Sequence, residues 1–145
     1  MPSARRATMT RRARLPWTRP EMAQRIFVVE DDPFLKEAVS LILTHAHYDV
    51  TTTAVGRGAV DLIRRARPHL VLLDIHLPDI NGLTVLRNLR SAGLSMAVVM
   101  MTADNRPETV RDVLASGGNG YLLKPFEPQD LVARVRRALE GLATP

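Results

Sequence analysis

Three short polar groups in this chain each follow an apolar, strand-like run. They are the acidic cluster Glu30-Asp31-Asp32, the single carboxylate Asp74, and the pair Lys124-Pro125. In an open parallel α/β sheet, side chains just past the carboxyl ends of the strands converge on one crevice. We therefore expect these carboxylates and one ammonium group to meet in a single pocket. That combination of charges suits a divalent cation and a phosphoryl group.

The elements that would position these groups alternate along the chain. Apolar strand-like runs and segments of helical period follow one another five times, which indicates a parallel sheet with crossover helices. Strands are expected over 25–29, 49–53, 69–73, 96–101 and 120–123. Helices are expected from Pro33, over 58–67, through 83–89, from Pro107 to Ser116, and from Pro128. The pattern predicts a doubly wound (βα)5 fold of the α/β class.

Composition limits the class of protein further. At 145 residues and 46% hydrophobic content, the chain is long enough for one well-buried domain. The absence of cysteine excludes disulfides and thiolate metal sites. No apolar run approaches the roughly 20 residues that a membrane-spanning helix needs. The first 25 residues lack the apolar core of a signal peptide.

The positive charge is concentrated in residues 1–21. This segment has one acidic residue, Glu21, and the later part of the chain has 14 basic and 14 acidic residues. The segment contains six arginines: Arg5, Arg6, Arg11, Arg12, Arg14 and Arg19. We predict a disordered basic tail over 1–21, a folded domain over 22–142 and a short C-terminal tail over 143–145. The basic tail has two interpretations: an electrostatic arm for nucleic acid or an acidic partner, or a segment without a specific role, with translation starting at Met22.

The polar groups and their flanking strands resemble the response-regulator receiver domain of bacterial two-component signalling. The matching pieces are VVEDD (28–32), LLDIHLPDING (72–82), MMTA (100–103) and YLLKPF (121–126). They extend over about residues 22–142, and each lies at the end of an expected strand. The resemblance implies a flavodoxin-like fold, as in chemotaxis regulators, with five parallel strands in the order 2-1-3-4-5.

The resemblance assigns the acidic residues to phosphoryl transfer. It implies that Asp74 is the phosphoacceptor, whereas the alternative is a strand-end aspartate that caps the next loop. It also implies an Mg²⁺ (or Mn²⁺) site in which Asp31 and Asp74 bind directly, Glu30 acts largely through water, and His76 offers its main-chain carbonyl. Asp32 is expected chiefly to cap the helix that starts at Pro33. A place in the metal shell is the alternative for Asp32.

The resemblance also assigns residues after the fourth and fifth strands. Lys124 is expected to bind the phosphoryl oxygens, and the Lys124–Pro125 peptide bond is expected to be cis. The hydroxyl of Thr102 and the backbone N–H of Ala103 are expected to bind the phosphoryl group as well. Thr102 and Tyr121 are the expected switch pair. The alternative for Tyr121 is an ordinary aromatic residue at the edge of the sheet.

Two positions are expected to tune the phosphoryl lifetime. His76 lies two residues after Asp74, and Asp104 lies two residues after Thr102. Both would flank the path of the hydrolytic water. The alternative for His76 is a loop residue that only provides its carbonyl.

Together these features predict a cytoplasmic single-domain response regulator of a phosphorelay. A sensor histidine kinase or a histidine phosphotransfer protein would be its phosphodonor. The face formed by the fourth helix, the fifth strand and the fifth helix would contact a downstream protein or a second copy. We expect no enzyme activity beyond its own phosphorylation and dephosphorylation, no membrane association, and no nucleic-acid binding without another domain. The alternatives are a receiver domain cut from a longer DNA-binding regulator, and a phosphate sink or relay shuttle.

Overall fold

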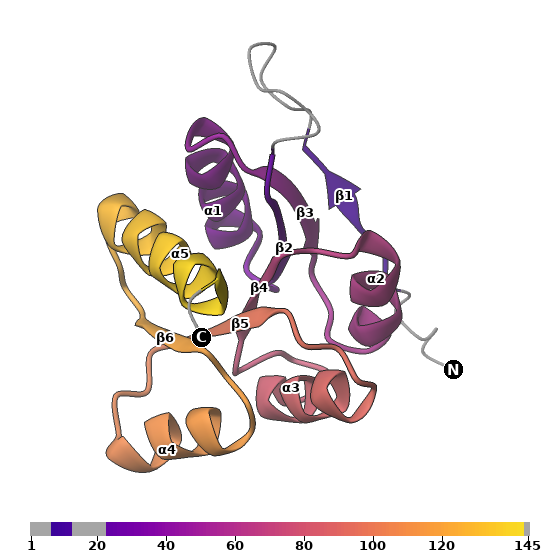
Figure 1. Cartoon of the computed structure of the whole chain (residues 1–145), viewed down its shortest axis with the longest axis vertical. Helices are drawn as coiled ribbons and strands as arrows, with labels where there is room; N and C mark the ends of the chain where they lie inside the picture. The colour runs from indigo at the N-terminus through magenta and orange to yellow at the C-terminus, as the bar shows by residue number, and fades with distance from the viewer. Residues whose placement is uncertain (1–6, 13–22, 144–145) are drawn as a thin grey trace.

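The computed structural model describes residues 7–12 and 23–143, which form an α/β fold around one six-stranded sheet (Figure 1). The strands are β1 (Thr10–Arg11), β2 (Arg25–Val29), β3 (Asp49–Thr53), β4 (Leu70–Asp74), β5 (Ala97–Thr102) and β6 (Gly120–Leu123). The helices are α1 (Pro33–His45), α2 (Ala59–Ala66), α3 (Gly82–Ser91), α4 (Pro107–Ala115) and α5 (Pro128–Ala143). Among the described residues, no helix combines the length and apolar character needed to cross a membrane.

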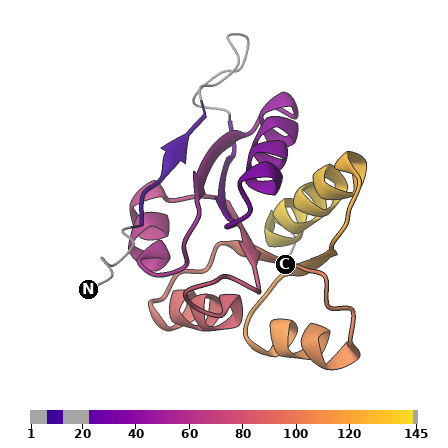
Figure 2. The same ribbon diagram turned by 180° about the vertical axis from the view of Figure 1, so that it is seen from behind.

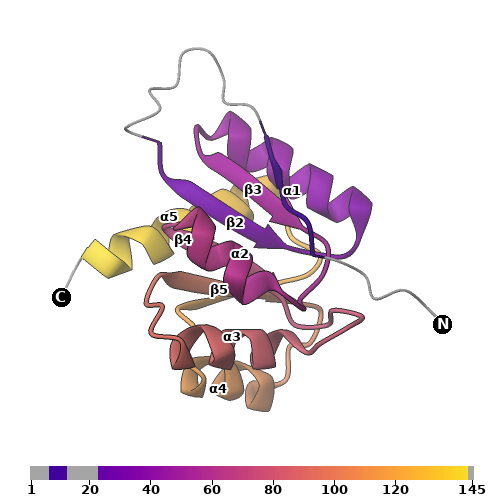
Figure 3. The same cartoon turned by 90° about the vertical axis from the view of Figure 1, so that its right-hand side faces the viewer.

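The helices cover both faces of the sheet, as the alternating pattern predicts. Helices α1 and α5 lie side by side on one face, and α2, α3 and α4 cover the other (Figures 2 and 3). Each face has its own apolar core. Val39 and Leu43 of α1 pack with Leu131 and Val135 of α5, and all four are fully buried. Because helices cover both of its faces, the central strand β4 is buried throughout.

The sheet order is β1-β3-β2-β4-β5-β6. The five strands from β2 to β6 are parallel to one another. Their order, β3-β2-β4-β5-β6, is the predicted order 2-1-3-4-5 when β2 is counted as the first strand. The sixth strand, β1, was not predicted, and it pairs antiparallel with the outer side of β3 (Figure 3). The pairing satisfies backbone groups that an edge strand would otherwise leave free.

The prediction of a disordered tail was wrong for residues 7–12. Thr10 lies opposite Thr52, and the backbone N–H of Arg12 donates to the carbonyl of Val50 at 3.0 Å. The guanidinium of Arg11 binds Asp49 with two hydrogen bonds, of 3.0 and 2.6 Å. This ion pair offsets the cost of burying a carboxylate that is only 4% exposed. Residues 1–6 and 13–21 of the predicted tail lie outside the described residues.

Candidate functional site

The carboxyl ends of β2 and β4 bring three carboxylates together. Val29 and Leu73, which precede Glu30 and Asp74, lie opposite each other in adjacent parallel strands. Carboxylate oxygens of Glu30, Asp31 and Asp74 all lie within 4.8 Å of one another. Glu30 and Asp74 are buried, with relative exposures of 1% and 4%, and Asp31 is partly exposed. Three clustered carboxylates repel one another and need positive charge nearby.

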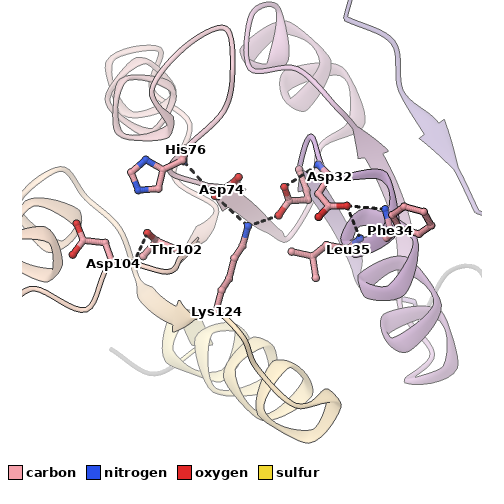
Figure 4. Close-up of polar contacts among 9 residues, drawn as sticks. Asp32, Phe34, Leu35, Asp74, His76, Thr102, Asp104 and Lys124 are labelled. Carbon is pink, nitrogen blue, oxygen red and sulfur yellow. Dashed lines mark hydrogen bonds and ion pairs between the residues drawn. The ribbon is translucent and has the colours of Figure 1, made fainter.

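Lys124 provides positive charge from the end of β6. Its Nζ lies 2.6 Å from Glu30 Oε1. The same Nζ lies 3.3 Å from Asp74 Oδ1, and Figure 4 shows Lys124 extending toward Asp74. Burial raises the pKa of Glu30 to about 7, although Lys124 acts in the opposite direction. Burial would lower the pKa of Lys124, but the two carboxylates outweigh it and the pKa is raised. Lys124 is therefore a permanent cation in the acidic pocket at neutral pH.

Asp32 begins helix α1. Its Oδ1 accepts hydrogen bonds from the backbone N–H groups of Phe34, at 2.9 Å, and Leu35, at 3.3 Å (Figure 4). The backbone N–H of Asp32 donates to Glu30 Oε2 at 3.2 Å. Asp32 is thus the helix cap that the sequence indicated, and it also helps to hold Glu30 in place.

The loop after Asp74 folds back tightly on the end of β4. The backbone N–H of His76 donates to Asp74 Oδ1 at 3.2 Å, while the imidazole of His76 is exposed. Gly82, the first residue of α3, donates its N–H to the carbonyl of Ile75 at 2.7 Å. A Cβ on Gly82 would lie only 2.1 Å from the carbonyl oxygen of Asp74. Only glycine fits here, so the start of α3 can approach the acidic site directly.

Thr102 is fully buried as the last residue of β5, one position beyond the predicted strand. Its Oγ1 accepts a 3.0 Å hydrogen bond from the backbone N–H of Asp104. Its carbonyl accepts a 2.8 Å hydrogen bond from the backbone N–H of Lys124. Ala103 follows as an exposed residue with a small side chain. The peptide bond between Lys124 and Pro125 is cis, the isomer that the resemblance implies.

Tyr121 lies on β6, next to Met100 of β5. Its ring packs against the core on the face covered by α2, α3 and α4. Its hydroxyl is buried and has no hydrogen-bond partner among the described residues. Burial, and secondarily the negative charge of Asp104, raise the pKa of Tyr121. The hydroxyl therefore lies within the electrostatic influence of the β5–α4 connection.

An acidic cluster beside a lysine at the carboxyl ends of parallel strands is the arrangement that the resemblance to receiver domains implies. Residues 26–136 match the model of the response regulator receiver domain. The chain belongs to this family. The match runs from β2 into α5 and contains every site residue described above.

Known receiver proteins resemble this one in sequence and in structure. The DNA-binding response regulator MtrA of Mycolicibacterium smegmatis is 44% identical over 118 residues, which are 81% of this chain and 51% of MtrA. The chain thus spans about half the length of the curated relatives it matches. The BeF3-activated N-terminal receiver domain of Klebsiella pneumoniae RstA has a TM-score of 0.75 at 34% identity, covering 80% of this chain and 98% of that one. The chemotaxis response regulator CheY4 of Vibrio cholerae has a TM-score of 0.77 at 28% identity, covering 81% of this chain and 99% of that one.

The receiver site fits a hard divalent cation. Its donors are carboxylate oxygens from Glu30, Asp31 and Asp74, and such cations prefer oxygen ligands. Carboxylates alone do not define a site, but here two of the three are buried at the carboxyl ends of the adjacent parallel strands β2 and β4. The residues present are therefore suited to hold Mg²⁺.

Several residues of this receiver site were not assigned a role from the sequence. Asp79 accepts hydrogen bonds from the backbone N–H groups of Gly56, at 3.1 Å, and Arg57, at 2.8 Å. These hydrogen bonds connect the loop after Asp74, which contains Asp79, to the loop after β3, which contains Gly56 and Arg57. Arg106 and Thr109 bind the carboxylate of Asp104. A signal existed for Asp79, since an acidic residue directly after Pro78 is typical of a turn.

Proposed function

We propose that this receiver domain accepts a phosphoryl group on Asp74 from a phosphohistidine of a sensor kinase or phosphotransfer protein. The observation that carries the proposal is the position of Lys124. Its ammonium lies 3.3 Å from the buried carboxylate of Asp74, at the edge of the sheet where Thr102 also ends its strand. A carboxylate can attack phosphorus only where positive charge offsets the repulsion between two anions.

The transfer needs little covalent chemistry from the protein. An oxygen of Asp74 forms a bond to phosphorus as the bond from phosphorus to the donor imidazole nitrogen breaks. The electron pair of that bond stays with the imidazole. Lys124 balances charge on the phosphoryl oxygens, and the hydroxyl of Thr102 and the N–H of Ala103 donate hydrogen bonds to them.

The acidic residues hold the cofactor in this proposal. Glu30, Asp31, Asp74 and the main-chain carbonyl of His76 would bind Mg²⁺, with Mn²⁺ as a substitute. When bound, the ion supplies positive charge that offsets the negative charge of the phosphoryl group. Asp32 keeps its role as the cap of α1, because its Oδ1 already accepts hydrogen bonds from the backbone N–H groups of Phe34 and Leu35.

Phosphorylation would be read out through Thr102 and Tyr121. To bind the phosphoryl group, the Thr102 hydroxyl must exchange its hydrogen bond with the N–H of Asp104. Tyr121, whose buried hydroxyl has no partner among the described residues, adjusts to that change. The face that responds consists of α4, β6 and α5, where Leu114 and Leu123 are 60% and 41% exposed. A downstream protein or a second copy would bind there, and the chain would act on no external substrate.

A second candidate function is that of the receiver part of a DNA-binding regulator. It is favoured by the similarity to MtrA of Mycolicibacterium smegmatis, which is named as DNA-binding and of which this chain covers 51%.

The basic N-terminal segment could itself bind DNA, but two of its arginines are already engaged within the fold: Arg11 binds Asp49, and Arg12 binds Ser40 and Glu37. Replacing Arg5, Arg6, Arg14 and Arg19 by serine therefore tests that segment without removing β1. The affinity for duplex DNA is measured at several salt concentrations. If a salt-dependent affinity persists after the substitutions, the N-terminal segment is not the part of the chain that binds the DNA.

The phosphoacceptor proposal is tested by intact mass. The chain is incubated with acetyl phosphate and MgCl₂, alongside Asp74→Asn and alongside Asp112→Asn, which alters an exposed aspartate of α4. We expect one phosphoryl group on the wild type and on Asp112→Asn, and none on Asp74→Asn or with a chelator. Equal uptake by Asp74→Asn would overturn the assignment. A proposed relay shuttle would also take up the group, but its α4–β6–α5 face would stay unchanged in amide exchange.

A further inference from the structure

The connection from β5 to α4 contains a compact set of contacts around Asp104. Oδ1 of Asp104 accepts hydrogen bonds from the backbone N–H of Arg106, at 2.9 Å, and from its Nε, at 3.0 Å. Oδ2 accepts hydrogen bonds from Nη2 of Arg106 and from the hydroxyl of Thr109, both at 2.7 Å. Both oxygens of the carboxylate are therefore bound by residues at the beginning of α4.

These contacts determine where the carboxylate of Asp104 points. Figure 4 shows it turned away from Asp74 and Lys124, toward α4, with Thr102 between. The backbone N–H of Asp104 donates in another direction, to Thr102 Oγ1 at 3.0 Å. The position two residues after Thr102 is the one expected to flank the hydrolytic water. In this arrangement the side chain at that position is held out of the water's path.

Arg106 provides most of this restraint. It contributes three donors to the carboxylate, from its backbone N–H, Nε and Nη2, whereas Thr109 contributes one. Its side chain is 73% exposed, and that of Asp104 is 15% exposed. The hydrogen bonds from Arg106, followed by that from Thr109, hold the pKa of Asp104 well below its usual range. Asp104 also remains a carboxylate at neutral pH when Arg106 moves away, because an aspartate with its ordinary pKa of about 3.9 is ionised there.

We propose that Arg106 is a positioning residue that prolongs the phosphorylated state by holding the Asp104 carboxylate against α4. The proposal rests on the proposed function, because it concerns the acyl phosphate formed on Asp74. It adds to that function a residue that controls how long the signal lasts.

Hydrolysis of the acyl phosphate is the step that Arg106 would slow. The oxygen of water forms a bond to phosphorus as the bond from phosphorus to the Asp74 oxygen breaks. The electron pair of that bond restores the Asp74 carboxylate, and the proton of the water passes to the phosphate product or to solvent. A released Asp104 carboxylate can accept a hydrogen bond from the attacking water and orient it. A well-positioned proton acceptor contributes about 100-fold or more to such steps, so a merely released one should contribute about three- to tenfold.

The test measures the decay of the phosphoryl group directly. Wild type, Arg106→Ala, Asp104→Asn and the double variant are loaded with acetyl phosphate and MgCl₂, desalted, and followed by intact mass. Arg111→Ala, which removes an exposed arginine of α4, is the matched control. We expect Arg106→Ala to shorten the half-life about three- to tenfold and Arg111→Ala to leave it unchanged. Arg106→Lys, which keeps a cation beside Asp104, should restore much of the half-life.

The double variant separates positioning from a general structural effect. If Arg106 acts through the carboxylate, Arg106→Ala will have no further effect in a chain that already contains Asp104→Asn. Equal half-lives of wild type and Arg106→Ala would overturn the proposal, as would an undiminished effect in the double variant. A poorly folded Arg106→Ala is replaced by Arg106→Gln, with the same expectations. A wild-type chain that never takes up the phosphoryl group would overturn the proposed function as well, so the two failures are distinguishable.

Discussion

Lys124 Nζ lies 2.6 Å from Glu30 Oε1, although 94 positions separate the two residues in the sequence. The contact joins the end of the edge strand β6 to the end of β2, and the side chain of Lys124 passes beside Asp74 on β4. The contact neutralises the carboxylate of Glu30, which is only 1% exposed. It also holds the ammonium group beside Asp74, where that group would contact the phosphoryl oxygens. One side chain thus supports the fold of the site and its proposed chemistry.

Replacing Lys124 by methionine should slow phosphoryl uptake by roughly 100-fold, because a preorganised positive donor is lost from the site. The rate is measured by intact mass after addition of acetyl phosphate and MgCl₂. Lys36→Met, which changes the other lysine of the chain, is the control and should behave as the wild type. Uptake by Lys124→Met within threefold of wild type would contradict the role given to Lys124.

Gly82→Ala should destabilise the fold by about 1–3 kcal/mol, the usual cost of forcing a side chain into a filled space. The new Cβ would lie 2.1 Å from the carbonyl oxygen of Asp74, and the backbone must shift to admit it. The free energy of unfolding in urea measures the effect. Gly141→Ala is the matched control, because a Cβ there meets nothing within 4 Å. This control should be neutral or stabilising by about 0.5–1 kcal/mol, as expected within a helix.

Asp79→Asn should destabilise the fold by about 1–2 kcal/mol at pH 7, and the difference should shrink in acid. Burial would raise the pKa of Asp79, but hydrogen bonds from the N–H groups of Arg57 and Gly56 outweigh it, and the pKa is lowered. A lowered carboxyl pKa contributes stability that is present above its unfolded value, about 3.9, and is lost as the pH falls through the folded value.

The prediction for Asp79 is checked by urea unfolding of wild type and Asp79→Asn at pH 7 and pH 3. Asp112→Asn, at an exposed position of α4, should show little effect at either pH. A difference between wild type and Asp79→Asn that grows in acid would have the wrong sign for this account.

Arg11→Ala should loosen β1 and lower the free energy of unfolding by about 1 kcal/mol. The value is modest because Arg11 is 57% exposed, although its partner Asp49 is buried. Hydrogen exchange gives the sharper measurement. The N–H of Arg12, which donates to the carbonyl of Val50, should be protected in the wild type and should lose most of that protection in Arg11→Ala. Arg65→Ala, on the exposed side of α2, should leave it protected.

The parallel sheet and its acidic edge follow from the sequence because both depend on local patterns. The apolar run before Asp74 predicts a buried central strand, and Asp32 before Pro33 predicts a capped helix. Strand β1 could not be predicted in this way, since Thr10 and Arg11 have no apolar alternation and their pairing depends on the distant Asp49. The close approach of Gly82 to Asp74 and the hold of Arg106 on Asp104 likewise depend on how loops fold in three dimensions. These contacts leave no periodic signal in the sequence.

The role of Asp74 as phosphoacceptor is tested by locating the phosphoryl group after loading the chain with acetyl phosphate and MgCl₂. Reduction of an acyl phosphate with borohydride converts the modified carboxyl group to an alcohol, which peptide mapping by mass spectrometry can place. We expect the alcohol at position 74, in the peptide that contains Asp74, and no alcohol when chelator is present during loading. An alcohol at Glu30, Asp31 or Asp104, or none anywhere under conditions in which the chain is folded, would contradict this role of Asp74.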